Sequence, residues 1–453
     1  MSRAQIRKVI SGLIILLSLS ACGGGGGGDA PATPTVNTAH GSNSSTDISG
    51  FTVQDVSECA ATNAASPNVV PICVDNGPDP SQVNVVNEPY VTVTLCVPGS
   101  TTQCVTVDHV LVDTGSTGLR VAVEALGNQS LPLPAVKTSA GSKPVAECYQ
   151  YVSGWTWGSL NKADVYVGGL VARSVPIHML GYSSANPSLG GAGGGAFPHV
   201  PASCSGSNAN GNMNSVSEMG ANAILGLSTF DRDCDGCDTV AANNQYFSCT
   251  SLGTCTSVAV PLTDQPGHLG LYFSSDYANG VSITMPTVTG VTASKLQGTL
   301  TFGVPSLPEA ATQLVLNPYG QFTISYNGQT YSSGFIDSGS NALFFDSTAG
   351  IGNCSYNTGF YCPTSAVTIT AKNTDGSGHS NTFSMPLNNI DALMGQLGST
   401  AVIVGLAGPV TGSTTAVDPT FDLGFPFFIG RTVYVVRQGT AMGSAYGVVA
   451  YTP

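Results

Sequence analysis

One short pattern occurs twice in this 453-residue chain and restricts its fold more than any other feature. Within residues 109–121, an apolar run ends at Asp113 and continues as Thr-Gly-Ser. Within residues 334–346, a second apolar run ends at Asp337 and continues as Ser-Gly-Ser. Both copies therefore have a β-rich run, an aspartate, a hydroxyl residue, a glycine and a serine. A repeat of this kind predicts two similar lobes that each present one carboxylate.

Each aspartate is expected at the end of a β-hairpin. Residues 90–96 alternate as a strand, Pro98-Gly99 forms a turn, and residues 104–113 return. Residues 322–326, an Asn-Gly turn and residues 329–337 repeat the same order. The recurrence of strand, turn, strand and aspartate is the strongest sign of internal organisation in the sequence.

The composition favours a mainly β protein and argues against nucleic-acid binding. Short Val/Thr/Ile-rich runs lie between turn residues, and only 9% of the residues are charged. The net charge is −13, and no basic cluster follows residue 8, so a polyanionic partner is not expected.

The length leaves room for two or three domains or for one large bilobal unit. We expect a signal segment at 1–21, a flexible tether at 22–50, an N-terminal lead-in and lobe at 51–300, and a C-terminal lobe at 301–453, with the boundary near 296–304. The tether contains a six-glycine run and polar residues that cannot bury a core.

The N-terminus has the features of an export signal. Three basic residues precede an apolar stretch that is too short for an ordinary membrane-spanning helix. Leu19-Ser20-Ala21-Cys22 resembles the lipobox of bacterial lipoproteins, which predicts cleavage before Cys22 and lipidation of its thiol. The alternative is a plain secretory signal with a chance cysteine. Gly23 in place of an aspartate favours the outer membrane by resemblance to lipoproteins of enteric-type bacteria, facing either the periplasm or the exterior.

The cysteine count agrees with an oxidising compartment. Of 13 cysteines, removal of Cys22 leaves 12, an even number that allows six disulfides. Cys234-Asp-Gly-Cys237 is either a disulfide or a redox or metal motif, but no second Cys-x-x-Cys or His-Glu-x-x-His occurs. We therefore expect no metal and no cofactor, and these disulfides: Cys96–Cys104, Cys249–Cys255, Cys354–Cys362, Cys59–Cys73, Cys148–Cys204 and Cys234–Cys237.

Three further stretches have distinct signals. Residues 145–170 hold both tryptophans and predict a hairpin with an aromatic tip. Residues 183–220 form a long Gly/Ser/Asn/Pro insertion, and loops of that length usually have a function or are disordered. Residues 389–397 are the best short helix candidate, with an asparagine that caps it.

Paired aspartates of this kind support acid–base hydrolysis. If a pseudo-two-fold axis relates the lobes, Asp113 and Asp337 meet and share one proton. The ionised partner then takes a proton from a water, and the protonated partner donates to the substrate carbonyl. The expected supporting residues are Gly115 and Gly339, which let the backbone approach, Thr114 and Ser338, which bond across the axis, and Ser116 and Ser340, which orient the carboxylates.

The two motifs resemble the active-site signatures of pepsin-like aspartic peptidases. Ile224-Leu225-Gly226 and Leu423-Gly424 resemble the apolar-apolar-Gly elements that pass behind each aspartate in that family. Residues 151–169 resemble its flap hairpin, which implies flap or substrate roles for Tyr151 and Trp157, with Tyr149 as an alternative flap tyrosine.

The resemblance covers about residues 88–453 and implies a mainly β, bilobal, double-lobe barrel with pseudo-two-fold symmetry. It also implies a monomeric endopeptidase that acts on peptides or proteins. The chain is similar as well to a group of proteobacterial lipoproteins known only as a domain of unknown function.

Several departures from the pepsin pattern are present. Pepsins usually have Trp-Val-Pro after the first motif, where this chain has Arg120-Val-Ala. The second glycine element continues as Phe425-Pro426 instead of an aspartate. The lead-in has no basic segment to mask acidic carboxylates, so acid-triggered activation is not expected.

Three functions compete at this stage. The first is a lipid-anchored aspartic endopeptidase, and the second is a catalytically inactive pepsin-like lipoprotein that binds peptides or an envelope protein. A structural envelope lipoprotein explains the anchor but leaves the repeated aspartate turns as mere turn residues.

Overall fold

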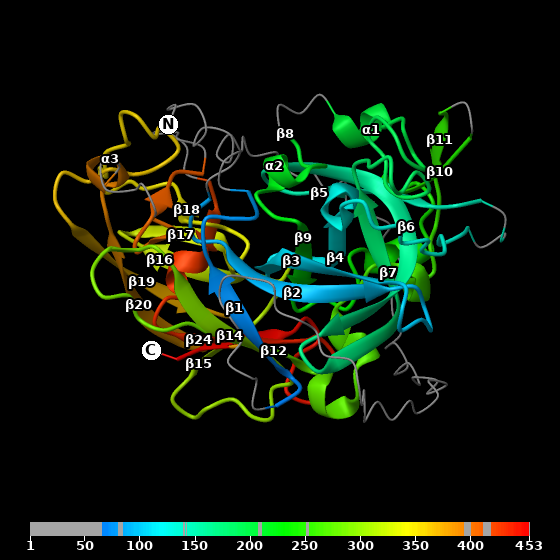
Figure 1. Cartoon of the computed structure of the whole chain (residues 1–453). Helices are drawn as coiled ribbons and strands as arrows, with labels where there is room; N and C mark the ends of the chain where they lie inside the picture. The colour runs from blue at the N-terminus through cyan, green and yellow to red at the C-terminus, as the bar shows by residue number, and fades with distance from the viewer. Residues whose placement is uncertain are drawn as a thin grey trace.

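A computed structural model of the chain describes residues 66–79, 85–138, 141, 143–206, 211–250, 253–393, 400–410 and 418–452. The predicted signal segment and tether, with Cys22, lie outside the described residues. The described part is mainly β, and two lobes lie on either side of a shared sheet (Figure 1). The predicted mainly β, bilobal fold is confirmed.

The N-terminal lobe is built on a closed barrel of six strands. Their order is β6-β7-β4-β9-β3-β2, and β2 pairs with β6 to close the ring. Side chains such as Val93, Val112 and Leu225 have no solvent exposure, because alternate residues of every strand point into the barrel. The barrel strands are β2 (Pro89–Cys96), β3 (Cys104–Asp113), β4 (Thr117–Ala122), β6 (Gly154–Val167), β7 (Leu170–Leu180) and β9 (Ala223–Leu227).

Three strands extend the barrel sheet beyond β6. They are β5 (Ala146–Gln150), β10 (Tyr246–Cys249) and β11 (Cys255–Ser257), in the order β11-β10-β5-β6.

The C-terminal lobe is an open seven-stranded sheet in the order β20-β19-β16-β17-β23-β18-β22. Aromatic rings fill its core: Phe345 stacks on Phe421 at 4.4 Å, and Tyr331 meets Phe421 edge-on at 5.1 Å. Its strands are β16 (Phe322–Tyr326), β17 (Gln329–Ile336), β18 (Leu343–Phe345), β19 (Val367–Thr374), β20 (Ser380–Leu387), β22 (Ala407–Gly408) and β23 (Thr420–Leu423). The predicted Asn-Gly turn joins β16 to β17, with φ of 50° at Asn327 and 75° at Gly328.

A third set of six strands runs below and between the lobes in Figure 1. Their order is β1-β14-β12-β24-β25-β15, so strands from early and late parts of the chain lie side by side. The expected lobe boundary near 296–304 falls on β14, an inner strand of this sheet. The strands are β1 (Val69–Val74), β12 (Gly280–Thr284), β14 (Leu296–Phe302), β15 (Thr312–Val315), β24 (Thr432–Val436) and β25 (Val448–Tyr451).

The remaining elements are short. The predicted helix at 389–397 begins where expected, since the Asn389 side chain accepts the Ala392 N–H at 2.9 Å, and residues 394–397 lie outside the described part. No described helix has the length and apolarity needed to cross a bilayer. These elements are α1 (Ala202–Ser205), α2 (Val216–Met219), α3 (Ile390–Leu393), β8 (Gly211–Asn212), β13 (Thr292–Ala293), β21 (Val402–Ile403) and the 3₁₀ turns η2 (Val123–Leu126), η3 (Asp235–Asp238), η4 (Leu262–Asp264), η5 (Leu269–Tyr272), η6 (Ser275–Tyr277) and η8 (Phe425–Phe427).

The two lobes repeat one strand arrangement. In each, the strand that leads to the aspartate pairs antiparallel with its hairpin partner and parallel with a later strand: β3 with β2 and β9, and β17 with β16 and β23. Val112 lies opposite Leu225, and Ile336 lies opposite Leu423. The two predicted apolar-apolar-Gly elements are therefore the strands beside the aspartates.

Five of the six predicted disulfides are present, at Cys96–Cys104, Cys148–Cys204, Cys234–Cys237, Cys249–Cys255 and Cys354–Cys362. Cys73 is also disulfide-bonded, and its expected partner Cys59 lies outside the described residues.

The shared sheet predicts that the two lobes unfold together. Leu300 is fully buried in β14 between Val70 and Ile283, so Leu300→Ala should lower the free energy of unfolding by roughly 2–5 kcal/mol. Both tryptophans lie in the N-terminal lobe, so their fluorescence reports that lobe, whereas far-UV circular dichroism reports both lobes. The two transitions should shift together.

The neighbouring exposed Gln297→Ala is the matched control and should change stability by less than about 0.5 kcal/mol. Separate fluorescence and dichroism transitions in the Leu300 variant would show that the lobes unfold independently.

Candidate active site

The two predicted aspartates meet between the lobes. Asp113 ends β3, and Asp337 follows β17 directly. A Cβ placed on Gly115 would lie 2.6 Å from the carboxyl carbon of Asp337, and one on Gly339 would lie 2.7 Å from Oδ1 of Asp113. Each carboxylate thus lies against the glycine of the opposite loop, an approach that any side chain at that glycine would block.

Four buried hydrogen bonds join the two loops across the axis. The Thr114 hydroxyl donates to the Ile336 carbonyl at 3.1 Å and accepts the Ser338 N–H at 2.9 Å. The Ser338 hydroxyl donates to the Val112 carbonyl at 2.6 Å and accepts the Thr114 N–H at 3.1 Å. Each hydroxyl serves as donor and acceptor, so Thr114 and Ser338 lock the two turns in one relative position.

Each carboxylate is also held by its own loop. The N–H of the glycine two residues later donates to Oδ1, and the hydroxyl of the serine three residues later donates to Oδ2. The distances are 2.8 Å from Gly115 and 2.5 Å from Ser116 to Asp113, and 2.8 Å from Gly339 and 3.0 Å from Ser340 to Asp337.

The Asp337 carboxyl group favours its protonated form. Burial raises the pKa of Asp337 well above its usual range, and the charges of Asp113 and Asp422 raise it further. Gly115 is exposed and Gly339 is partly exposed, so the carboxylates face solvent on this side.

The predicted flap hairpin is formed by β5 and β6, with Tyr149 opposite Thr156. Tyr151 N–H closes the turn on the Gly154 carbonyl at 2.7 Å. The charge of Asp113 adds to the effect of burial in raising the pKa of both tyrosine hydroxyl groups. The Tyr149 ring packs on the Arg120 guanidinium at 3.6 Å, whereas the buried Tyr151 hydroxyl has no hydrogen-bond partner among the described residues.

The structure gives Trp157 a packing role in place of the expected contact with substrate. Its side chain is fully buried, and its indole N–H donates to the Phe197 carbonyl at 3.0 Å. The ring meets Phe197 and Phe247 edge-on. No surface of Trp157 is therefore left to contact a substrate.

The 183–220 insertion packs on this hairpin. Phe197 covers Trp157, the short strand β8 pairs with the start of β6, and Asn214 accepts the Trp157 backbone N–H at 2.6 Å. The Cys148–Cys204 disulfide ties β5 to the insertion covalently. The insertion thus holds the flap hairpin next to its turn.

A buried charge cluster beneath the hairpin was not predicted from the sequence. Arg120, at the position where the resembled signature has tryptophan, has no solvent exposure. Its Nη2 lies 3.0 Å from both Glu147 Oε1 and Asp233 Oδ2, and Nη1 donates to the Thr117 carbonyl at 2.6 Å. His178 Nδ1 lies 3.2 Å from the second oxygen of Glu147.

The cluster balances its own charge. Burial and the Glu147 charge raise the pKa of Asp233 well above its usual range, and burial lowers the pKa of His178 to about 4. Burial opposes ionisation of Glu147, but His178 and Arg120 outweigh it and lower the pKa of Glu147. The Arg120 guanidinium is thus paired with the Glu147 carboxylate, and burial favours the uncharged forms of Asp233 and His178.

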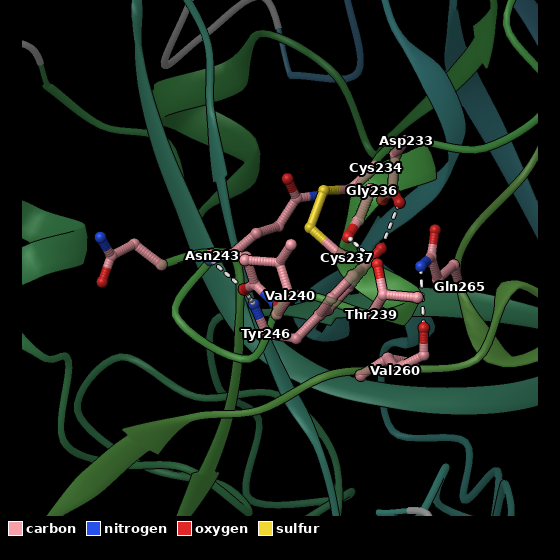
Figure 2. Close-up of a disulfide and its surroundings, with 12 residues drawn as sticks. Asp233, Cys234, Gly236, Cys237, Thr239, Val240, Asn243, Tyr246, Val260 and Gln265 are labelled. Atoms are coloured by element: carbon pink, nitrogen blue, oxygen red, sulfur yellow. Dashed lines mark hydrogen bonds between the residues drawn. A yellow bond between two sulfur atoms is a disulfide. The ribbon is translucent and has the colours of Figure 1, made fainter. Parts of the chain in front are cut away.

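Figure 2 shows what positions Asp233. It directly precedes the Cys234–Cys237 disulfide, and its carboxylate accepts a hydrogen bond from the Tyr246 hydroxyl. This Cys-x-x-Cys motif is a structural bridge beside the charge cluster. Cys354, Cys362 and Asp391 also lie close together, but both sulfur atoms are in a disulfide and are not free to bind a metal ion.

A family model described as a protein of unknown function (DUF3443) matches residues 64–451, and the chain belongs to this family. No curated protein matches the sequence. Among solved structures, the chain is similar to an aspartic proteinase from Irpex lacteus, with 14% identity, a TM-score of 0.41, and coverage of 85% of this chain and 96% of that chain. The family has no assigned activity, so a function has to be inferred from the site itself.

The charge cluster predicts a severe stability loss for Arg120→Met. The substitution leaves Glu147 buried without its cation, so the free energy of unfolding should fall by roughly 3–5 kcal/mol in chemical denaturation. Arg173→Met is the matched control, because Arg173 is half exposed and its partner Asp164 keeps hydrogen bonds from Gly99 and Ser174. That control should cost less than about 1 kcal/mol. Equal losses in the two variants would contradict the special role of the buried cluster.

Proposed function

We propose that this member of the DUF3443 family is an aspartic-type endopeptidase that hydrolyses peptide bonds with a water activated between Asp113 and Asp337. The observation that carries the proposal is the reciprocal approach of each carboxylate to the glycine of the opposite lobe. An aspartate that only caps its own turn is satisfied by donors of its own loop. Here four further hydrogen bonds hold the two turns face to face.

The protonation of the pair supports a division of roles. Asp113 is supported as an anion by the Gly115 N–H and the Ser116 hydroxyl, so it takes the proton of the attacking water. Asp337 holds the shared proton and donates it to the carbonyl oxygen of the scissile amide. As the tetrahedral intermediate collapses, the proton gained by Asp113 passes to the leaving nitrogen and a hydroxyl of the intermediate returns its proton to Asp337, which leaves the pair with one proton again.

The Tyr151 hydroxyl is the donor of the flap hairpin that we assign to the substrate. The Tyr149 ring packs on Arg120, whereas the Tyr151 hydroxyl is buried without a hydrogen-bond partner among the described residues. We assign Tyr151, and not Tyr149, as the flap tyrosine that donates to the bound peptide.

Location in the cell envelope is part of the proposal. The lipobox-like Leu19-Ser20-Ala21-Cys22 supports lipidation at Cys22 and an outer-membrane anchor, with the lobes in the periplasm or outside the cell. The five disulfides among described cysteines fit an oxidising compartment. We propose a monomer that acts on peptide or protein substrates there.

The first test is cleavage of a denatured mixed-protein substrate between about pH 3 and 7. Asp113→Asn and Asp337→Asn should each lower the cleavage rate by at least about 10²–10⁴-fold, because each removes one proton-transfer group. Asp276→Asn, at an exposed site in η6, is the control and should cleave at the wild-type rate. A folded wild type that binds peptides without cleaving them at any pH would replace the endopeptidase with the binding-protein function.

The second test separates the two flap tyrosines. Tyr151→Phe should lower kcat/KM about tenfold, because one hydrogen bond to the substrate is lost. Tyr149→Phe keeps the ring on Arg120 and should change kcat/KM by less than about threefold. The reverse result would assign the flap role to Tyr149.

A further inference from the structure

A third carboxyl group breaks the pseudo-symmetry of the site. In the N-terminal lobe, Ile224 of β9 lies between Leu111 and Arg120 on the neighbouring strands. The corresponding residue of the C-terminal lobe is Asp422 of β23, which lies between Phe335 and Phe344. An apolar position in one lobe is therefore acidic in the other, although the strand pairing around it is the same.

The surroundings of Asp422 are apolar, and its hydrogen bonding is incomplete. Its side chain is only 5% exposed, and both cross-strand neighbours are phenylalanines. Oδ1 of Asp422 is buried and has no hydrogen-bond partner among the described residues. A buried carboxyl group in such a setting is strongly destabilised as an anion.

Ser340 connects Asp422 to the dyad. The Ser340 hydroxyl donates to Oδ2 of Asp337 at 3.0 Å, and the same side chain also interacts with the Asp422 carboxyl group. The backbone on both sides is fixed, since Phe425 N–H donates to the Ser340 carbonyl at 2.7 Å and Asp337 N–H donates to the Leu423 carbonyl at 3.1 Å. The order is thus carboxyl, hydroxyl, carboxyl, with a rigid backbone behind it.

The charged groups that act on this site are all acidic. Asp113 acts on Asp422, and both Asp113 and Asp422 act on Asp337. Burial and the Asp113 charge raise the pKa of Asp422 well above its usual range, while the Ser340 hydrogen bond opposes this. Three neighbouring carboxyl groups keep their protons to higher pH than two do.

We propose that Asp422 is a positioning residue that orients the Ser340 hydroxyl toward Asp337 and keeps the shared proton of the Asp113/Asp337 pair in place toward neutral pH. The inference rests on the proposed endopeptidase function. Ionised Asp422 competes for the single hydrogen of the Ser340 hydroxyl, whereas protonated Asp422 leaves that hydrogen directed to Asp337. When Asp422 ionises, its added negative charge opposes loss of the proton that the pair shares.

Two substitutions separate the charge from the hydrogen bond. Asp422→Asn removes the charge but keeps a donor for Ser340. Asp422→Ile installs the residue found at the equivalent position of the N-terminal lobe and removes both. Asp276→Asn again serves as an exposed control that removes one carboxylate elsewhere.

The activity readout is the pH profile of kcat/KM for a peptide substrate. For Asp422→Asn, the alkaline limb should move to lower pH by about one unit, with a maximal rate within a few-fold of wild type. Asp422→Ile should show the same shift and also about a tenfold lower kcat. When Ser340 is already replaced by alanine, adding Asp422→Ile should cause no further loss of kcat. An alkaline limb that is unchanged or higher in Asp422→Asn would overturn the inference.

A second readout does not depend on activity. A carboxyl group whose pKa is raised on folding stabilises the protein fully below its unfolded pKa and loses that contribution as pH rises toward the folded pKa. The unfolding midpoint of Asp422→Asn minus that of wild type should therefore increase as pH rises above about 4. A difference in unfolding midpoint that does not change with pH would contradict the inference, whether or not the protein cleaves peptides.

The combined results distinguish this inference from the proposed function. Cleavage by wild type without either Asp422 effect overturns the role of Asp422 alone. Absence of cleavage together with the stability effect overturns the endopeptidase and supports the coupling of Asp422 to the carboxylate pair.

Discussion

The reciprocal hydrogen bonds between the Thr114 and Ser338 turns are the interaction on which the site depends. Two carboxylates at close range repel each other unless a proton is shared, so some other interaction must hold the turns together. The four bonds do this with buried groups that would otherwise be unsatisfied, which makes separation of the turns costly. These bonds fix the two aspartate turns face to face, and the close contacts of the glycines with the carboxylates depend on that placement.

The two lobes repeat a strand pattern but stabilise it by different means. The N-terminal lobe places Arg120 beside Ile224 and surrounds the cation with Glu147 and Asp233. The C-terminal lobe places Phe344 beside Asp422 and relies on an aromatic core instead. The strand pairs β4–β9 and β18–β23 are equivalent. The charged residue lies on the first strand of the pair in the N-terminal lobe and on the second strand in the C-terminal lobe. The side of the site next to the β5–β6 hairpin is held by an ion cluster, and the Asp337 side carries an extra acid close to the carboxylate pair.

The sequence predicted the features that depend on short patterns of residues or on the number of cysteines. Both hairpins, both aspartate turns and the five described disulfides depend on short patterns or on cysteine count, and all are present. The partners of Arg120 lie 27 and 113 residues away in sequence, so no spacing rule indicated them. Trp157 was expected to contact substrate because it belongs to the flap-like hairpin, but the insertion covers it. Asp422 lies beside a predicted glycine element, yet its position next to Ser340 depends on strand register, which residue type alone does not give.

The arrangement of the shared sheet sets the order in which the site can assemble as the chain is synthesised. Its strand β1 comes from the start of the described chain, and β25 is the last described strand. Four of the five described disulfides lie in the N-terminal lobe, which emerges first, and one lies in the C-terminal lobe. The early lobe can thus form its disulfides while Asp337 is still to be delivered. A chain interrupted between the lobes carries one carboxylate without its partner and therefore lacks the pair.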